Sequence, residues 1–307
     1  MRIFVAGATG VIGRRLIPLL VEAGSEVTAV ARTPEKRSQL ERQGATPISV
    51  DLFDPPAVEE AVAGHHTVIN MATSIPAGMR AMLPGAFNEN TRIRQEVSQN
   101  LAAAAMAARA QRFVQESFAP VYPDCGDEWI DESVPIAPAT YVESVRSAES
   151  AASEFAKSGG AGIVLRFAFF YGPDSPHTQD IVRLVKKRIA PGFGSPDGYM
   201  SSIWLDDAAE AVLAALEVPS GAYNVTDDLP MTRREAFNIL AAELGVKPPR
   251  MAGEWLKKVM GAVGETLSRS HRLSNAKFRH ASGWLPKIPS LREGWKLVAA
   301  PELEGRH

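Results

Sequence analysis

Three glycines near the N-terminus have the spacing of a phosphate-binding turn. Gly7, Gly10 and Gly13 follow an apolar run at residues 3–5 and precede a segment with helical periodicity at residues 14–21. A strand, a glycine turn and a helix in this order bring a pyrophosphate against the N–H groups of the helix N-terminus. The first glycine permits the tight turn, the second lets the phosphates approach and the third lets helix and strand pack closely. We therefore predict a dinucleotide site here, with a purely structural turn as the alternative.

The residue after the next predicted strand bears on which dinucleotide is bound. Residues 26–31 have strand character, and Arg32 follows them. An acid at this position usually indicates preference for the cofactor without a 2′-phosphate, because its carboxylate accepts hydrogen bonds from the ribose hydroxyls. A guanidinium is a forked donor that suits a phosphate dianion. Arg32 therefore favours NADP(H) over NAD(H), with Arg14 as a second candidate contact. The alternative for Arg32 is a solvated surface arginine.

Strands and helices alternate through the first half of the chain. The pattern predicts further strands at residues 46–50, 67–71, 112–115 and 162–166, and helices at residues 34–43, 55–63, 90–110 and 141–157. Such alternation is typical of crossover units and a parallel sheet covered on both faces. We therefore predict an α/β fold, a Rossmann doubly wound parallel sheet whose ligands bind at the carboxyl ends of the strands.

Beyond about residue 171 the pattern becomes irregular. It predicts helices at residues 179–189 and 206–216 and short strands at residues 202–205 and 222–225. We expect a Rossmann domain at residues 1–170, joined by returning segments around residues 200–228, and a smaller C-terminal substrate lobe within residues 171–307.

Composition excludes several classes of protein. The 307 residues carry a net charge of −2 with charges mixed along the chain, so neither nucleic acid nor a membrane is an expected partner. The single cysteine, Cys125, excludes an internal disulfide framework and suits a reducing compartment. No zinc-like spacing of Cys and His and no Gly-x-Ser-x-Gly elbow occurs, so we expect neither a metal site nor this type of hydrolase. We expect a cytoplasmic protein with a small-molecule substrate.

Several motifs resemble one family over nearly the whole chain. They are the glycine turn, Asp51-Leu52, the run at residues 166–173, the segment Trp204-Leu-Asp-Asp-Ala-Ala and the segment Gly221-Ala-Tyr-Asn. Together they resemble the extended or atypical branch of the short-chain dehydrogenase/reductase superfamily, the NAD(P)-dependent epimerase/dehydratase-like group. The resemblance implies the fold and a nicotinamide dinucleotide but no particular substrate.

The resemblance also implies which residues surround the cofactor. Asp51 and Leu52 would border the adenine, although Asp51 has a strand-end turn as its alternative role, and Ala72 and Thr73 would border the ribose. The full expected set is Gly7, Ala8, Thr9, Gly10, Val11, Ile12, Gly13, Arg32, Asp51, Leu52, Met71, Ala72, Thr73, Ser117, Tyr141, Phe167 and Phe169.

The catalytic motif that the resemblance implies is degenerate. Members that transfer hydride usually carry a Tyr, a Lys four residues later that lowers its pKa, and a Ser or Thr after the fifth strand. Tyr141 is present, but Val145 stands at the lysine position and Phe118 at the serine position, with Ser117 one residue earlier. Tyr141 and Ser117 are the predicted catalytic residues, and packing or ribose binding is the alternative role of Tyr141.

The missing lysine limits what Tyr141 can do. On a continuous helix Arg146, five residues on, would lie about 140° away from Tyr141 and could not replace the lysine. An unassisted tyrosine titrates near a pKa of about 10, so it can donate a proton but is a poor base at neutral pH.

Residues near the later strand ends are the candidates for substrate contact. They are Phe118, Tyr122, Tyr171, His177 and Trp204. His177 could act as an acid or base near neutral pH, with an exposed loop histidine as the alternative. The apolar character of most of this set favours a small organic substrate.

These residues lead to one principal hypothesis and two alternatives. The principal hypothesis is an NADP(H)-dependent oxidoreductase that acts on a small organic carbonyl or enone. The alternatives are a catalytically inactive NADP(H)-binding sensor or regulatory protein, and a non-redox epimerase or lyase that uses the same pocket. The resemblance also implies a homodimer formed through the helix of Tyr141 and the long helix before the fifth strand.

Overall fold

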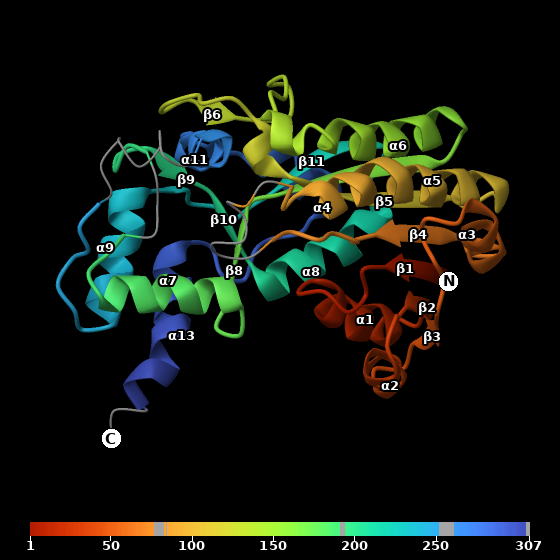
Figure 1. The fold of residues 1–307 in the computed structure, drawn as a ribbon, viewed down its shortest axis with the longest axis horizontal. Coiled ribbons are helices and arrows are strands. Elements are labelled where there is room, and N and C mark those ends of the chain that lie inside the picture. Colours follow the sequence, from red (N-terminus) through yellow and green to blue (C-terminus); the bar gives the residue numbers. More distant parts are fainter. Residues whose placement is uncertain (77–82, 84, 191–193, 252–260, 305–307) are drawn as a thin grey trace.

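The central feature of the fold is a seven-stranded parallel sheet (Figure 1). The computed structural model describes residues 1–76, 83, 85–190, 194–251 and 261–304. The strand order is β11-β7-β5-β4-β1-β2-β3. The strands are β1 (Arg2–Ala6), β2 (Glu26–Val30), β3 (Thr46–Ile48), β4 (Thr67–Asn70), β5 (Arg112–Phe118), β7 (Ala161–Phe167) and β11 (Gly221–Val225). The predicted doubly wound Rossmann sheet is therefore confirmed.

The order of strands reverses beside β1, which pairs with both β2 and β4. Ile3 lies opposite Val27 of β2 and Thr67 of β4, so the chain winds outward from β1 in both directions. A crevice forms at the carboxyl ends of the strands where such an order reverses. The glycine turn follows β1 directly and therefore lies at this reversal.

Helices cover both faces of the sheet. One face carries α1 (Gly13–Glu22), α2 (Pro34–Arg42) and α8 (Leu205–Ala214), and the other carries α3 (Pro55–Val62), α5 (Ser98–Ala107) and α6 (Val145–Lys157) (Figure 1). Alternate residues of β1 fill the two cores: Ile3 packs with Leu16 on one side, and Phe4 packs with Leu101 on the other. Both sides of the sheet are therefore apolar, as expected of a buried parallel sheet.

The predicted long helix before the fifth strand is interrupted. Its residues form α4 (Asn88–Arg92), a π-helical turn (Ile93–Val97) and α5, and Arg94 on the π-turn is buried. The prediction of one regular helix was wrong because the π-turn admits an extra residue per turn, which points Arg94 inward.

Two boundaries near the predicted catalytic residues also differ from expectation. Strand β5 continues to Phe118, so Ser117 lies inside the sheet rather than in a loop. Tyr141 lies on a separate 3₁₀ turn (Thr140–Val142), and α6 begins only at Val145. The expected single helix from Tyr141 onward is thus corrected, and the angular argument about Arg146 does not apply.

The second half of the chain builds a smaller group of elements with a core of its own. Tyr171, Trp204 and Trp295 pack edge to face at its centre. Helices α7 (Pro176–Lys186), α9 (Arg233–Glu243) and α13 (Leu291–Glu304) contribute to this core, whereas α12 (Ala276–Ser282) packs against β11 and α11 (Gly261–Ser268) contacts the 3₁₀ turn after β5. The paired short strands are β8 (Phe169–Tyr171) with β10 (Ser202–Trp204), β9 (Tyr199–Met200) with β12 (Met231–Thr232), and β13 (Arg272–Leu273) with β6 (Trp129–Ile130), which comes from the first half of the chain. Short 3₁₀ turns occupy Ala119–Val121 and Ala215–Glu217.

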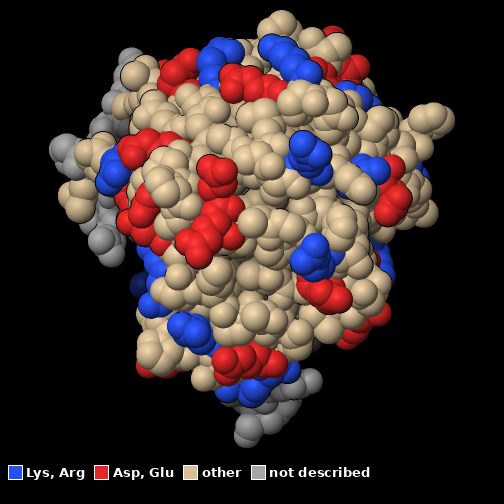
Figure 2. All heavy atoms as spheres, turned by 90° about the vertical axis from the view of Figure 1, so that its right-hand side faces the viewer, with Lys and Arg blue, Asp and Glu red and all other residues tan. Residues whose placement is uncertain are grey.

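Charges are mixed on the molecular surface. Figure 2 shows lysines and arginines interspersed with acids on the face that carries the N-terminus. The mixture agrees with the net charge of −2. Among the described residues, no helix is both long and apolar enough to cross a membrane.

Asp227, just after β11, is a buried carboxyl with an incomplete set of partners. It is 1% exposed, and its Oδ2 accepts a hydrogen bond from Ser202 at 2.6 Å, while Oδ1 has no partner among the residues that the structure describes. Burial, together with the nearby acids Asp228, Asp207 and Glu293, raises the pKa of Asp227 well above its usual range. Burial therefore favours the protonated form of this carboxyl.

We predict that this carboxyl makes stability fall as pH rises. A carboxyl with a raised folded pKa contributes most below its unfolded pKa of about 3.9, and the contribution is lost at about 1.4 kcal/mol per pH unit up to the folded pKa. Asp227→Asn keeps the group neutral, so its free energy of unfolding should decline less with pH in urea titrations. Asp54→Asn, at an exposed acid that precedes α3, is the control. Equal slopes for wild type and Asp227→Asn would contradict the prediction.

Candidate active site

The glycine turn is held very close to the end of β4. Gly7 has a φ of +78°, and a Cβ on it would lie 2.3 Å from the carbonyl carbon and oxygen of Met71. A Cβ on Gly13, the first residue of α1, would lie 2.3 Å from the Gly7 carbonyl oxygen. Only glycine fits at these two positions, because the obstacles are backbone atoms.

Gly10 has different surroundings, which fit a phosphate group. A Cβ there would meet only the Gly7 oxygen at 3.3 Å, so the space above the turn is open on the protein side. Helix α1 has no side-chain cap at its N-terminus, but the Arg14 N–H donates to the Gly10 carbonyl at 3.1 Å and the Arg15 N–H donates to the Ile12 carbonyl at 2.9 Å. An anion would therefore bind the N–H groups that lie between Gly10 and Arg14. The turn therefore fits the pyrophosphate of a dinucleotide.

The predicted adenosine contacts lie along the same edge of the sheet. Arg32 follows β2 and is exposed, while Met71 follows β4 and is buried. Asp51 is exposed, and its Oδ1 accepts a hydrogen bond from the Phe53 N–H at 3.0 Å, so it does serve as a strand-end turn residue. The Ala72 N–H donates to Asn70 Oδ1 at 3.1 Å, which fixes the backbone at the end of β4.

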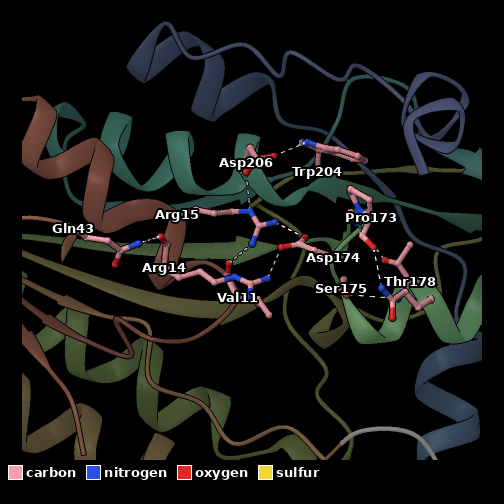
Figure 3. Close-up of polar contacts among 12 residues, drawn as sticks. Val11, Arg14, Arg15, Gln43, Pro173, Asp174, Ser175, Thr178, Trp204 and Asp206 are labelled. Atoms are coloured by element: carbon pink, nitrogen blue, oxygen red, sulfur yellow. Dashed lines mark hydrogen bonds and ion pairs between the residues drawn. The ribbon is translucent and has the colours of Figure 1, made fainter. Parts of the chain in front are cut away.

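Ion pairs tie the start of α1 to the second half of the chain (Figure 3). Arg14 Nη2 lies 2.6 Å from Asp174 Oδ2, and Arg15 Nη2 lies 2.5 Å from the other oxygen of this carboxylate. Arg15 also pairs with Asp206 at 2.7 Å and donates to the Val11 carbonyl at 2.9 Å. Arg14, the second predicted cofactor contact, is thus engaged by the turn after β8.

Tyr141 is half-buried beside residues distant in sequence. Its ring packs edge-on against Phe87, with the ring centroids 4.8 Å apart. Burial raises its pKa, and a hydrogen bond with Thr266 and the charge of Arg269 offset part of that rise. The phenol therefore stays protonated at neutral pH and can act as a proton donor.

Val145, at the lysine position of the motif, and Ser117, the predicted catalytic serine, both lie in the interior. Val145 is fully buried and packs with Val121 and Val142. Ser117 is fully buried as well, and its Oγ donates to Glu149 Oε1 at 2.7 Å. The apolar side chain at 145 continues this cluster, so no cation lies at the lysine position.

The bond from Ser117 belongs to a buried polar network between β5, β7 and α6. Arg166 Nη2 donates to Glu149 at 2.7 Å, and Arg166 Nη1 donates to the Tyr122 hydroxyl, also at 2.7 Å. The Tyr122 hydroxyl in turn donates to Asn224 Oδ1 at 2.9 Å. Every member thus has a partner inside the protein, which identifies a structural role for Ser117 in this arrangement.

Three of the predicted substrate contacts are buried in the core. Tyr122 and Tyr171 are both fully buried, and the Tyr171 hydroxyl donates to the Ser290 carbonyl at 3.1 Å. Burial raises the pKa of Tyr122 to about 12. Trp204 is 7% exposed, and its Nε1 donates to Asp206 at 2.9 Å (Figure 3). The expected substrate contact of these three residues is therefore corrected, because their large aromatic side chains form the core and do not line a pocket.

Four further predicted residues have mixed positions. Phe118 and Phe169 are half-buried, whereas Phe167 is 2% exposed and belongs to the main core. His177 lies on α7 and is exposed at the surface, with its ring edge-on to Phe169 at 4.7 Å. Desolvation lowers the pKa of His177.

A buried ion pair near Phe118 was not expected. Arg94 and Glu116 are 2% and 5% exposed, and Arg94 Nη2 lies 2.9 Å from both Glu116 oxygens. Within the described part of the chain, Arg94 Nε and Nη1 have no partner, and burial raises the pKa of Glu116. Glu116 stands between the polar residues Gln115 and Ser117 in β5, so the sequence did not signal its burial. Nothing in the sequence indicated the π-turn that brings Arg94 to it.

We predict that Gly10→Ala separates cofactor binding from folding. The added methyl meets little protein but occupies the space where phosphates approach, so dinucleotide affinity should fall about tenfold or more. Fluorescence titration measures the affinity, and thermal unfolding without cofactor should stay close to wild type. Gly7→Ala is the contrasting variant, because its methyl collides with the Met71 backbone and should lower the unfolding temperature itself. Unchanged affinity in Gly10→Ala would remove the turn from the cofactor site.

Comparison with known proteins agrees with this geometry. Residues 3–226 match the model of the NAD dependent epimerase/dehydratase family. The chain is 32% identical over 306 residues to a 3-diazoavenalumate denitrifying reductase from a Streptomyces species, covering 96% of this chain and 99% of the relative. It is 30% identical over 290 residues to a 2-alkyl-3-oxoalkanoate reductase from Shewanella oneidensis, covering 87% and 72%.

The solved structures show the same architecture. A UDP-glucose 4-epimerase from Thermus thermophilus, in complex with NAD, is 25% identical, with 98% of each chain covered and a TM-score of 0.76. The expected resemblance is therefore confirmed: the chain belongs to the NAD-dependent epimerase/dehydratase family of the short-chain dehydrogenase/reductase fold.

Proposed function

We propose that the protein is an NADP(H)-dependent reductase of a small organic carbonyl or enone, with Tyr141 as the proton donor. The observation that carries this proposal is the state of Tyr141: burial raises its pKa, and Val145 stands at the position where the motif has a lysine. Reduction needs an acid that delivers a proton, whereas the reverse oxidation and epimerisation need a base. A tyrosine kept in its protonated form therefore favours reduction over the non-redox alternatives.

The related enzymes support the same direction of reaction. The Streptomyces and Shewanella relatives are both reductases by name, and the second acts on a 2-alkyl-3-oxoalkanoate, which carries a ketone. We extend the ketone chemistry to this chain. The half-buried Phe118 and Phe169 near the strand ends favour an apolar substrate.

The cofactor would be held by the glycine turn and by Arg32. When bound, the reduced nicotinamide supplies a hydride to the substrate. Tyr141 donates its proton to the oxygen of the reduced carbonyl or of the enolate, and the resulting phenolate recovers a proton from water. Charge is balanced, because one hydride and one proton together add two electrons and two hydrogens to the substrate.

The residues at the end of β2 favour NADP(H) as the cofactor. Ala31 is buried and Arg32 is exposed, while the Thr33 hydroxyl caps α2 by accepting from the Lys36 N–H at 3.4 Å. No acid stands at this strand end to accept hydrogen bonds from ribose hydroxyls. A forked cation there suits a 2′-phosphate.

The second candidate function is a sensor that binds the cofactor without turnover. The observation that favours it is that Val145 and Ser117 are both used for packing or internal hydrogen bonds.

For either function we propose a cytoplasmic protein that forms a homodimer through α5 and α6. Their exposed faces carry small side chains that would allow close helix packing, namely Ala103, Ala107, Ser150 and Ser153.

Replacing Arg32 tests the preference for NADP(H). Loss of a charge-assisted hydrogen bond to a phosphate is worth about 1.5–3 kcal/mol, so Arg32→Ala should weaken NADPH binding roughly 10- to 100-fold. NADH binding should change little, because that cofactor has no 2′-phosphate. Arg42→Ala, at the exposed far end of α2, is the matched control for charge. An equal effect on both cofactors would argue against a contact with the 2′-phosphate.

Replacing Tyr141 tests the reaction. Tyr141→Phe should lower kcat for ketone or enone reduction about 100-fold, the low end of what a positioned acid contributes, because water can donate in its place. NADPH affinity should be unchanged. Tyr223→Phe is the control, since its hydroxyl bonds to the Pro219 carbonyl in the core. Tight NADPH binding by the wild type without turnover of any ketone, quinone or enone would favour the sensor instead.

A further inference from the structure

Arg94 is a buried guanidinium that uses only one of its three nitrogens inside the protein. Its Nη2 lies 2.9 Å from each carboxylate oxygen of Glu116. Nε and Nη1 have no partner among the described residues, although together they carry three N–H donors. A buried donor without an acceptor costs free energy, because the water that bonded it in the unfolded chain is lost. A ligand that brings an acceptor atom would remove this cost.

The backbone departs from a regular helix at the residue with these unused donors. Arg94 lies on the π-turn Ile93–Val97, between α4 and α5, and this turn also contacts α6. Such turns are rare in proteins and occur frequently at functional sites. Glu116, on β5, holds the inward-pointing guanidinium through Nη2 and leaves its other nitrogens unoccupied.

Phe118 connects this guanidinium to the surroundings of Tyr141. The Arg94 Cζ lies 5.9 Å from the centroid of the Phe118 ring. Phe118 and Tyr141 both pack against the apolar cluster that contains Val145. Position 118 is also the one where the catalytic motif has a serine, and a phenyl ring cannot donate a hydrogen bond. Arg94 therefore brings unused donors to the residue that replaces the donor of the motif.

We propose that Arg94 is a catalytic residue that donates hydrogen bonds from Nε and Nη1 to the carbonyl oxygen of the substrate. The proposal rests on the proposed function, the reduction of a ketone or enone. Both nitrogens are shielded from solvent in the structure, and Phe118 is the half-buried neighbour of the guanidinium. Binding of the substrate would therefore move this ring aside. Glu116 is the positioning residue that keeps the guanidinium in place.

The charge of the pair favours a neutral oxygen over a carboxylate as the ligand. Glu116 already neutralises Arg94, so a ligand carboxylate would bring a second negative charge close to the first in a buried place. A carbonyl oxygen is neutral when it binds and becomes negative only as a hydride reaches the carbon. Donors aimed at this oxygen therefore bind the transition state more strongly than the substrate. Arg94 keeps all its protons, and the proton that completes the reduction comes from Tyr141.

The first test reads the Nε–H group of Arg94 by NMR and does not depend on turnover. The protein is labelled with ¹⁵N-arginine and saturated with NADP⁺, which has no hydride to transfer, and the resonance is assigned by its loss in Arg94→Lys. Saturation with the apolar enone 4-phenylbut-3-en-2-one should move the Nε–H proton downfield. The buried Arg166 Nε–H, which already donates to Glu149 at 2.9 Å, should not move.

A second probe tests the class of ligand. Benzoate carries the same ring with a carboxylate in place of the enone. A shift of the Arg94 Nε–H with benzoate but not with the enone would make the site one for anions and overturn the proposal. No shift with either probe would mean that only internal water satisfies these donors, and it would overturn the proposal as well.

The matching kinetic test removes the whole buried pair. Arg94→Met alone would leave the Glu116 carboxylate buried without its partner, so Arg94→Met/Glu116→Leu is used, because a buried ion pair can be replaced by apolar residues without loss of the fold. Its kcat for reduction of the enone should fall about 100-fold or more, as when one donor to a developing oxyanion is lost. Arg92→Met/Glu96→Leu makes the same change in an exposed pair before and within the same π-turn and should keep the wild-type kcat. Wild-type kcat in the folded Arg94→Met/Glu116→Leu protein would overturn the proposal.

The two measurements separate this proposal from the one on which it rests. If the enone moves the Arg94 Nε–H but the wild type reduces no ketone or enone, the proposed function fails while the carbonyl site stands. If the wild type reduces the enone and Tyr141→Phe slows the reaction, but neither the resonance nor the variant without the pair responds, the role of Arg94 fails while the proposed function stands.

Discussion

The close approach of the glycine turn to the end of β4 is the constraint on which the rest of the structure depends. Gly7 passes so near the Met71 backbone that no side chain fits between them, and Gly13 starts α1 directly against the Gly7 carbonyl. This packing sets the direction of α1 and places its N-terminus at the end of β1, where the strand order reverses. The cofactor site is thus a consequence of how tightly two strand ends and a helix can meet.

Two kinds of charged contact hold the parts of the protein together around that site. Arg14 and Arg15 reach across to Asp174 and Asp206, at places where the carboxylates are at least half exposed, so salt and water weaken each pair. The network through Glu149, in contrast, is buried between β5, β7 and α6. The ion pairs of Arg14 and Arg15 join α1 to the second half of the chain. The network through Glu149 connects β5, β7 and α6 inside the protein.

The residues that stand in place of the usual catalytic motif are used for packing and internal hydrogen bonds. Val145 continues an apolar cluster, and the hydroxyl of Ser117 is held inside the buried network, so neither faces a ligand. Tyr141 lies on its own 3₁₀ turn, where its ring packs edge-on against Phe87. The three positions that the motif would place together therefore have three different surroundings in the folded chain.

Local periodicity, spacing and residue type were enough to predict the parallel sheet, the glycine turn and Arg32 at the end of β2. The fold was needed to show that Arg14 pairs with Asp174, that Tyr122 and Tyr171 lie in the core, and that Arg94 turns inward on a π-helix. The pattern of a strand is local, whereas the position of a side chain's partner depends on residues 22 to 160 positions away, whose approach is set by packing of the whole chain.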